Sequence, residues 1–222
     1  MSNRLLRGTL QDRKKFGYYG AMAKLRCEGR PVSLILLAGG KSRRMKADKA
    51  RLPLPDGTMI QRILGQVEGL FDEILVSVSG DRDRRLPGCR IVPDEFEGGG
   101  PLAGIGAGLK AAANDVCAVL ACDIPDIDVR FLGDLVRKAS KFEIVVPVSK
   151  TGYLEPLFAV YRRCLVPRIG DALRAKEYSV LRLIEKSRAL RVGMKSTDGL
   201  RNINTPGDYA EYLESLSSKT KD

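Results

Sequence analysis

Two glycines and a group of cations follow an apolar run near the start of the chain. Residues 32–38 (VSLILLA) lead into Gly39 and Gly40. The cations that come next are Lys41, Arg43, Arg44 and Lys49. Glycines after a buried strand let backbone N–H groups approach a polyphosphate, and lysine and arginine donate to its oxygens. The pattern therefore predicts a phosphate-binding loop.

A Walker A motif and a plain surface turn fit this loop less well. Residues 40–42 (GKS) match the end of a Walker A motif, but that motif needs a glycine five positions before Gly40, where the chain has Ile35. We therefore exclude a P-loop nucleotide hydrolase. A surface turn with solvated charges would account for two glycines alone, but the buried run and the four nearby cations favour phosphate binding.

An aspartate follows a second apolar run. Residues 116–121 (VCAVLA) are followed by Cys122 and Asp123, with Asp126 and Asp128 nearby. Mg²⁺ prefers oxygen ligands and commonly takes one or two carboxylates together with substrate phosphates. An aspartate in a turn before a proline is common, so the metal role depends on the phosphate-binding loop. Together the two segments predict Asp123 as a Mg²⁺ ligand.

A third segment, residues 98–104 (GGGPLAG), is rich in glycine. Its spacing is similar to a dinucleotide-binding fingerprint, but Pro101 interrupts the pattern and the segment does not open the first strand-helix-strand unit. A loop that presses its backbone against a nucleobase or ribose is compatible with this segment, and so is a flexible turn. Asp94, which follows residues 91–93, is either a further acceptor for a base or sugar or a turn residue at a strand end.

The elements that must position these residues alternate along the chain. Short apolar runs alternate with stretches of helical periodicity from Val32 onwards. This alternation predicts an α/β fold in which helices cover both faces of a mostly parallel sheet. Such sheets bind ligands beyond the carboxyl ends of strands, so we expect Gly39 and Asp123 at one edge. The predicted strands cover residues 32–38, 74–78, 91–92, 116–121, 144–148, 157–161 and 190–194.

Capping residues indicate where helices begin. Asp128 and Thr205 precede stretches of helical periodicity, and Pro101 and Pro206 fall in the first turn of a predicted helix. The predicted helices lie near residues 60–70, 102–112, 128–139, 166–173, 180–184 and 205–216.

More than half of the excess positive charge belongs to the first residues. The chain has 222 residues and a net charge of +11. Residues 1–31 hold eight lysines and arginines against two acidic residues, or +6, which leaves +5 for the rest. We predict a basic extension over residues 1–31, a single domain over 32–217 and a tail over 218–222. This moderate charge on the domain suits phosphorylated small molecules, and we do not expect nucleic acid as a partner.

Residue counts narrow the chemistry and the location. The chain has no histidine, which excludes Ser-His-Asp and Cys-His catalysis and histidine metal sites. No apolar run approaches the length of a membrane span, and the basic N-terminus lacks the apolar stretch of a secretion signal. Five cysteines without a Cys-x-x-Cys pair suit reduced thiols. We therefore expect a cytoplasmic protein with no membrane partner.

Taken together, the segments resemble nucleotidyltransferases with a Rossmann-like fold, and most closely the molybdenum cofactor guanylyltransferase family. The resemblance implies a three-layer Rossmann-like fold with a mostly parallel twisted sheet. It also implies Mg²⁺-dependent transfer of GMP from GTP to the phosphate of molybdopterin, which releases pyrophosphate and forms the guanine dinucleotide cofactor. The matching segments are LAGGKSRRM (37–45) with DK (48–49), PDEF (93–96), GPLAGI (100–105), CDIP (122–125), EPLFAVY (155–161) and RNINTP (201–206).

The resemblance also implies residue roles. Arg44 and Lys49 would hold the phosphates of GTP, Asp94 would contact the guanosine, and Asp123 would bind Mg²⁺, so that Arg44, Lys49 and Asp123 are the implied catalytic residues. Ser77 stands where family members can carry an asparagine that contacts the nucleotide, and residues 1–31 have no counterpart. The other implied contacts are Leu37, Ala38, Gly39, Gly40, Gly100 and Pro101 for GTP, and Asn202 and Asn204 on the pterin side.

Such a transfer needs little acid or base catalysis, because the attacking phosphate is already anionic and the protein has to align it and neutralise charge. A chain without histidine can do this. The implied substrates are GTP and molybdopterin, and the implied protein partners are a molybdenum-insertion protein or an enzyme that accepts the cofactor. A cytidylyltransferase, or a guanylyltransferase for another phosphate acceptor, is the enzymatic alternative. A basic protein that binds nucleic acid or another partner on a degenerate enzyme scaffold is the non-enzymatic one.

Overall fold

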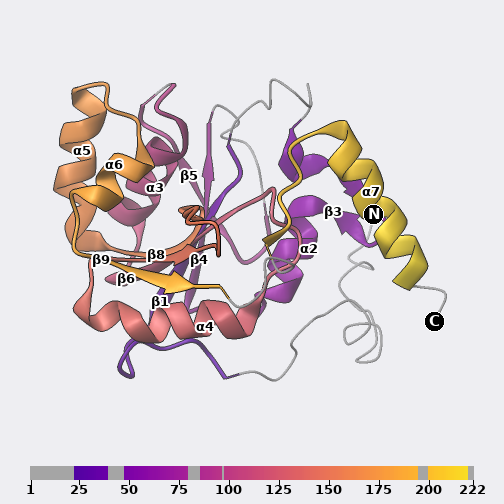
Figure 1. The fold of residues 1–222 in the computed structure, drawn as a ribbon, viewed down its shortest axis with the longest axis horizontal. Coiled ribbons are helices and arrows are strands. Elements are labelled where there is room, and N and C mark those ends of the chain that lie inside the picture. Colours follow the sequence, from indigo (N-terminus) through magenta and orange to yellow (C-terminus); the bar gives the residue numbers. More distant parts are fainter. Residues whose placement is uncertain (1–22, 40–47, 80–85, 97, 195–199, 220–222) are drawn as a thin grey trace.

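A seven-stranded sheet runs through the middle of the protein (Figure 1). The computed structural model describes residues 23–39, 48–79, 86–96, 98–194 and 200–219. The strands are β1 (Val32–Leu37), β4 (Glu73–Val78), β5 (Arg90–Pro93), β6 (Val116–Ala121), β7 (Ile144–Val148), β8 (Phe158–Arg162) and β9 (Ala189–Gly193). Their order is β5-β4-β1-β6-β8-β7-β9, and β8 alone among them runs antiparallel to its neighbours. The predicted α/β fold with a mostly parallel sheet is confirmed.

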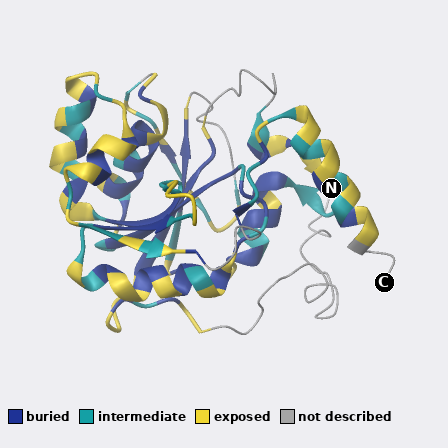
Figure 2. Cartoon of the chain, viewed as in Figure 1, coloured by how far each residue is buried: buried dark blue, intermediate teal, exposed yellow. Residues whose placement is uncertain are grey.

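Helices cover both faces of this sheet. They are α2 (Met59–Gln66), α3 (Gly100–Ala111), α4 (Val129–Lys138), α5 (Val166–Arg174), α6 (Val180–Glu185) and α7 (Pro206–Lys219). One apolar cluster joins the sheet to α2, α4 and α7, and a second joins the opposite face to α3, α5 and α6. Figure 2 shows that the central strands are buried, that the edge strands β5 and β9 are partly exposed, and that exposed residues lie on the outer sides of the helices. The protein is therefore a three-layer structure.

The central strand β1 contributes to both apolar clusters. All six of its residues are buried. Successive side chains of a strand point to opposite faces of the sheet. Accordingly, Leu34 and Leu36 belong to the cluster with α2, α4 and α7, whereas Ile35 and Leu37 belong to the cluster with α3, α5 and α6. The run, apolar apart from Ser33, thus reflects a strand that is covered on two faces.

Two helices begin at the predicted capping residues. Asp128 Oδ1 accepts a hydrogen bond from the backbone N–H of Phe131 at 2.9 Å, at the start of α4. Thr205 Oγ1 accepts from the N–H of Asp208 at 3.1 Å, and Asp208 Oδ2 accepts in return from the N–H of Thr205 at 2.8 Å. This reciprocal pair is a capping arrangement that fixes how residues before α7 enter the helix.

Several short elements lie outside the sequence predictions. Strands β2 (Pro53–Leu54) and β3 (Gly57–Thr58) form a hairpin before α2, and three 3-10 helices join larger elements: η1 (Lys49–Arg51), η2 (Ala139–Lys141) and η3 (Arg163–Leu165). Elements of two or three residues are too short for periodicity to indicate. Of the helices described above, none combines the length and the apolar character that a membrane span requires. All five cysteines are present as thiols, as predicted.

Residues 23–31 of the predicted basic extension lie against the domain. Leu25 is buried, and its N–H donates to the carbonyl of Leu70 at 2.8 Å. The guanidinium of Arg26 pairs with Asp72, and this contact is the main cause that lowers the pKa of Asp72 to about 2. The residues before this segment lie outside the described part of the chain. The predicted domain boundaries stay a prediction.

Candidate active site

The carboxyl ends of β1, β4, β5 and β6 meet at one edge of the sheet, because these strands are parallel. From β1 the chain adds β4 and β5 on one side and then returns to add β6 on the other side. This reversal is the topological switch point at which open α/β sheets bind ligands. The predicted meeting of Gly39 and Asp123 at one edge is confirmed, because Gly39 follows β1 and Asp123 follows β6.

Lys49 joins two distant segments at this edge. Its Nζ lies 3.1 Å from Asp123 Oδ2 and 2.8 Å from Asn204 Oδ1, although the two partners are 74 and 155 positions away in the sequence. The side chain of Lys49 is 14% exposed and that of Asp123 is 22% exposed, so a ligand can still reach both. An ammonium, a carboxylate and an amide that converge at a switch point form a site for a charged ligand.

Backbone contacts hold each member of this group. Asp48 caps the short helix η1 by accepting from the N–H of Ala50 at 3.0 Å. This contact fixes the backbone at Lys49, the first residue of η1. The carbonyl of Asp123 accepts from the N–H of Ile203 at 2.8 Å, so the segment before α7 lies directly against the loop after β6. The N–H of Asn204 donates to Asp208 Oδ2 at 2.8 Å. The side chains of Lys49, Asp123 and Asn204 therefore stand on short segments whose backbone is held by hydrogen bonds.

Glu155 supplies a second carboxylate beside Asp123. Because β8 is antiparallel, the residues that enter it lie at the same edge as the residues that leave β6, and the N–H of Ala121 donates to the carbonyl of Leu157. Burial raises the pKa of Glu155; a hydrogen bond from Asn202 opposes this rise, and the charge of Asp123 adds to it. The sequence analysis missed Glu155 as a site residue, although the matching segment EPLFAVY begins with it.

Ser77 and Asp94 form a second polar group, at the ends of β4 and β5. The hydroxyl of Ser77 donates to Asp94 Oδ1. Ser77 is only 1% exposed, and a Cβ atom on Gly104 would lie 2.8 Å from its Oγ, so α3 closes over the serine. Burial raises the pKa of Asp94, and the hydrogen bond from Ser77 opposes the rise. This geometry favours Ser77 as a support for Asp94 over the direct nucleotide contact expected from the sequence.

The glycine-rich segments border the same edge. A Cβ atom on Gly39 would lie 2.6 Å from the backbone N of Ser79, so the loop after β1 can pass the end of β4 only as glycine. Gly100 has φ +59° at the start of α3, and both Gly100 and Pro101 are exposed. Backbone N–H groups at a helix start attract anions. Exposed backbone therefore lies after β1 and at the start of α3.

The other predicted nucleotide contacts differ in exposure or lie outside the described residues. Leu37 and Ala38 are buried; the carbonyl of Leu37 accepts from the N–H of Cys122 at 3.1 Å, and the N–H of Ala38 donates to the carbonyl of Ser77 at 2.9 Å. Gly39 is exposed. Gly40 and Arg44 lie outside the described residues.

The two polar groups are separated along one sheet edge. Asp94 follows β5 and Asp123 follows β6, with β4 and β1 between them. Neighbouring strands are about 4.8 Å apart, so these two positions are roughly 14 Å apart across three strand spacings. That span suits a nucleotide that lies across the strand ends with its base toward Asp94 and its phosphates toward Lys49.

The carboxylates at this edge fit a divalent cation that arrives with a phosphorylated substrate. Asp123 and Glu155 are oxygen donors, and Mg²⁺ commonly takes one or two protein carboxylates with the rest of its ligands from phosphate and water. Within the described ranges, no group of three or more acidic or cysteine side chains is arranged to hold a metal ion. A site completed by the substrate agrees with both observations.

Fold and edge geometry are those of an α/β nucleotidyltransferase. Residues 34–191 match the MobA-like NTP transferase domain. Because the match covers more than half of the chain, the protein belongs to the MobA-like NTP transferase family. The resemblance seen in the sequence motifs is thereby confirmed.

Known proteins of three organisms illustrate the relationship. A probable molybdenum cofactor guanylyltransferase of Pelotomaculum thermopropionicum is 36% identical over 187 residues, which cover 80% of this chain and 89% of the relative. The solved structure of molybdopterin-guanine dinucleotide biosynthesis protein A from Archaeoglobus fulgidus has a TM-score of 0.72 at 22% identity, over 84% of this chain and 99% of that one. A Mycobacterium tuberculosis protein solved in complex with manganese has a TM-score of 0.62 at 19% identity, over 87% and 100% of the two chains.

Proposed function

We propose that the protein transfers GMP from GTP to the phosphate of molybdopterin, releasing pyrophosphate and forming the guanine dinucleotide cofactor. The observation that carries this proposal is the convergence of Lys49, Asp123 and Asn204 at the switch point of a MobA-like chain. The name of the Pelotomaculum thermopropionicum relative supports the same reaction. Family membership alone would leave both the nucleobase and the acceptor open.

Lys49 and Asp123 have different roles at the phosphates in this proposal. Asp123 would hold Mg²⁺, which would supply charge neutralisation at the phosphate oxygens. Lys49, whose Nζ contacts Asp123 in the structure, would donate to the triphosphate while the carboxylate holds the cation. The attacking phosphate of the acceptor is already anionic, so alignment and charge neutralisation supply the catalysis. The Mycobacterium tuberculosis protein of the same fold was solved in complex with manganese, which supports the use of a divalent cation.

The remaining proposed contacts are divided between the part of the sheet edge near Asp94 and the part near Lys49. Asp94, supported by Ser77, contacts the guanosine, and the open backbone at Gly39, Gly100 and Pro101 lies along the nucleotide. Arg44 and Gly40 complete the phosphate contacts. Asn202 and Asn204 face the pterin. A partner that inserts molybdenum or accepts the finished cofactor, and a cytoplasmic location, belong to the same proposal.

Pyrophosphate release with each nucleotide in turn tests this function. The full chain is incubated with Mg²⁺, molybdopterin and ATP, GTP, CTP or UTP, and the pterin product is identified by mass spectrometry. We expect turnover with GTP and a product heavier by one GMP. Turnover with CTP and not GTP would reject the base assignment. If the protein uses GTP only with a phosphate acceptor other than molybdopterin, molybdopterin is rejected as the substrate.

A further inference from the structure

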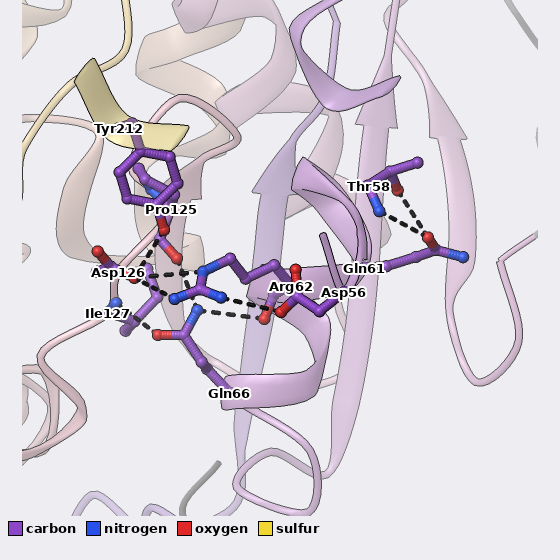
Figure 3. A network of polar contacts seen from close by, with 9 residues as sticks. All are labelled: Asp56, Thr58, Gln61, Arg62, Gln66, Pro125, Asp126, Ile127 and Tyr212. Carbon is purple, nitrogen blue, oxygen red and sulfur yellow. Dashed lines mark hydrogen bonds and ion pairs between the residues drawn. The ribbon is translucent and has the colours of Figure 1, made fainter. Parts of the chain in front are cut away.

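A buried polar network connects α2, the loop after Asp123 and α7 (Figure 3). At its centre, Arg62 of α2 donates from Nη1 to Asp56 Oδ2 and from Nη2 to Asp126 Oδ1, each at 2.9 Å. Tyr212 of α7 donates its hydroxyl to the same Asp126 oxygen at 2.9 Å, and its ring centroid lies 5.8 Å from the guanidinium carbon of Arg62. Asp126 is therefore held from two helices at once.

Gln66, one helical turn after Arg62, holds the backbone on both sides of Asp126. Its Nε2 donates to the carbonyl of Pro125 at 2.6 Å, and its Oε1 accepts from the N–H of Ile127 at 2.9 Å. The side chain of Gln66 lies between α2 and this loop, as Figure 3 shows. An amide that pairs with a carbonyl and an N–H of the same loop specifies one backbone conformation there.

This loop carries Asp123. Before the network, the N–H of Ile124 donates to the carbonyl of Ala121, and the carbonyl of Asp123 accepts from the N–H of Ile203. After the network, Asp128 caps α4. Residues 122–128 thus have contacts along their whole length. Asp123 itself is held by Lys49 and by the N–H of Ile203. The stretch that follows it, residues 125–127, is held by Gln66 and Arg62.

The polar network costs desolvation free energy, and apolar contacts would stabilise the loop at a lower cost. The side chains of Arg62 and Asp56 are 7% and 10% exposed, and a buried ion pair often contributes less stability than an apolar contact of the same size. The Asp126 side chain, through which Arg62 reaches the loop, is 41% exposed. Moreover, among the described residues Asp56 Oδ1 is buried with no hydrogen-bond partner. Hydrogen bonds and ion pairs of buried polar groups have preferred directions, so they fix the conformation of the loop even where they add little stability. A metal ligand such as Asp123, two to four residues before the contacts, requires a loop of fixed conformation.

We propose that Gln66, Arg62 and Tyr212 are positioning residues that fix where the Asp123 carboxylate stands relative to the strand ends. This inference rests on the proposed function, because it takes Asp123 as the cation ligand. It adds that α2 and the C-terminal helix α7 determine cation affinity without touching the cation or either substrate. Outer contacts that orient a metal ligand typically change affinity about 10- to 100-fold when they are removed.

Binding of Mn²⁺ measures this positioning without any need for turnover. Wild type, Gln66→Met and Tyr212→Phe are titrated with Mn²⁺ in the presence of a GTP analogue that resists cleavage between its α- and β-phosphates. Water-proton relaxation distinguishes Mn²⁺ held by protein from Mn²⁺ held by free nucleotide. We expect Gln66→Met to raise the dissociation constant for Mn²⁺ about tenfold. Tyr212→Phe, which keeps the ring beside Arg62 and loses only the hydroxyl, should shift it less in the same direction.

Arg162→Met is the matched control. Arg162 pairs with Asp115 at 2.6 Å and with the carbonyl of Ser140, so its loss also removes side-chain contacts that hold loops, but at the opposite edge of the sheet. We expect this variant to lose thermal stability and to keep the Mn²⁺ affinity of the wild type. A folded Gln66→Met protein with unchanged Mn²⁺ affinity overturns the inference. If Gln66→Met does not fold, an unchanged affinity in Tyr212→Phe does so.

Wild type decides whether the proposed function itself stands. Failure of wild type to bind Mn²⁺ with the GTP analogue would overturn the assignment of Asp123 as a cation ligand, and the positioning role with it. Binding by wild type that is insensitive to both variants overturns the positioning role alone.

Discussion

The ammonium of Lys49 lies 3.1 Å from Asp123 Oδ2. The same ammonium also donates to Asn204 Oδ1 at 2.8 Å. Lys49 therefore already neutralises the carboxylate that is proposed to bind a cation. In the proposed function, Asp123 would exchange Lys49 for the cation and Lys49 would exchange Asp123 for the phosphates of GTP, so that neither charge would be left unpaired in the partly buried site.

Replacing Lys49 by methionine tests its two proposed roles, which are to donate to the phosphates of GTP and to pair with Asp123. We expect Lys49→Met to lower turnover on the order of 100-fold or more, because a cationic donor at the phosphates is lost. At the same time, Mn²⁺ binding in the absence of nucleotide should tighten, because Asp123 no longer has a competing ammonium. The measurements are steady-state kinetics and an Mn²⁺ titration of the protein alone. Lys110→Met, which removes the exposed pair with Glu95, is the control. Equal Mn²⁺ affinity in Lys49→Met and wild type would contradict the competition.

Asp123→Asn removes the charge and keeps an oxygen that can accept from Lys49. We expect the thermal midpoint to stay close to that of the wild type, because the backbone contacts of this residue are unchanged. Mg²⁺-dependent pyrophosphate release should fall by at least about 100-fold. Asp115→Asn, at the opposite edge of the sheet, should retain turnover. Full activity in Asp123→Asn would remove Asp123 from the cation site.

The raised pKa of Asp94 predicts a pH dependence of GTP binding. Burial is the main cause of the rise. As pH falls, Asp94 gains its proton at a higher pH than an ordinary aspartate, whose pKa is about 3.9. If the charged carboxylate accepts a hydrogen bond from guanosine, the KM for GTP should increase as pH falls through the pKa of Asp94.

The sign of the stability change separates this effect from unfolding. Because the pKa is higher in the folded protein, the folded state binds the proton more tightly, and Asp94 by itself favours folding as pH falls through its folded pKa. KM is measured against pH for wild type and for Asp94→Asn, whose amide does not titrate. Identical profiles for the two proteins would exclude Asp94 as the titrating contact.

Gly104 tests how closely α3 must approach the Ser77–Asp94 pair. An added Cβ would lie 2.8 Å from Ser77 Oγ and 3.0 Å from Leu37 Cδ2, so Gly104→Ala should lose about 1–3 kcal/mol of unfolding free energy. Gly170→Ala in α5 meets only the flexible end of Arg174 at 3.4 Å and should gain up to about 1 kcal/mol from helix propensity. Urea unfolding of both variants measures the contrast. Equal stability of Gly104→Ala and wild type would show that the contact can relax.

The layers of this fold could be predicted because each element has its own periodicity. Residues 32–38, with Ser33 as the one polar residue, and residues 116–121 form apolar runs, and both runs hold central strands covered on two faces. The direction of β8 could not be predicted, because a strand has the same alternation in either direction. Glu155 was missed for this reason: its place beside Asp123 depends on β8 entering the sheet at the site edge.

The network around Arg62 has no comparable pattern in the sequence. Polar residues at positions 62 and 66 of an amphipathic helix ordinarily indicate a solvent-exposed face. They are buried here because Asp126 and Tyr212, 64 and 150 positions after Arg62, come to lie against them. The place of Asn204 in the site was likewise expected only from the family resemblance, since no local rule connects residues so far apart.

The reversal of β8 divides the site by chain polarity. Asp123 lies on a segment that leaves a strand, after β6, whereas Glu155 lies on a segment that enters one, before β8. The two neighbouring carboxylates therefore reach the edge from opposite chain directions. An insertion or deletion in the loop between β7 and β8 would displace one carboxylate and leave the other in place, so the length of that loop is constrained by the proposed cation.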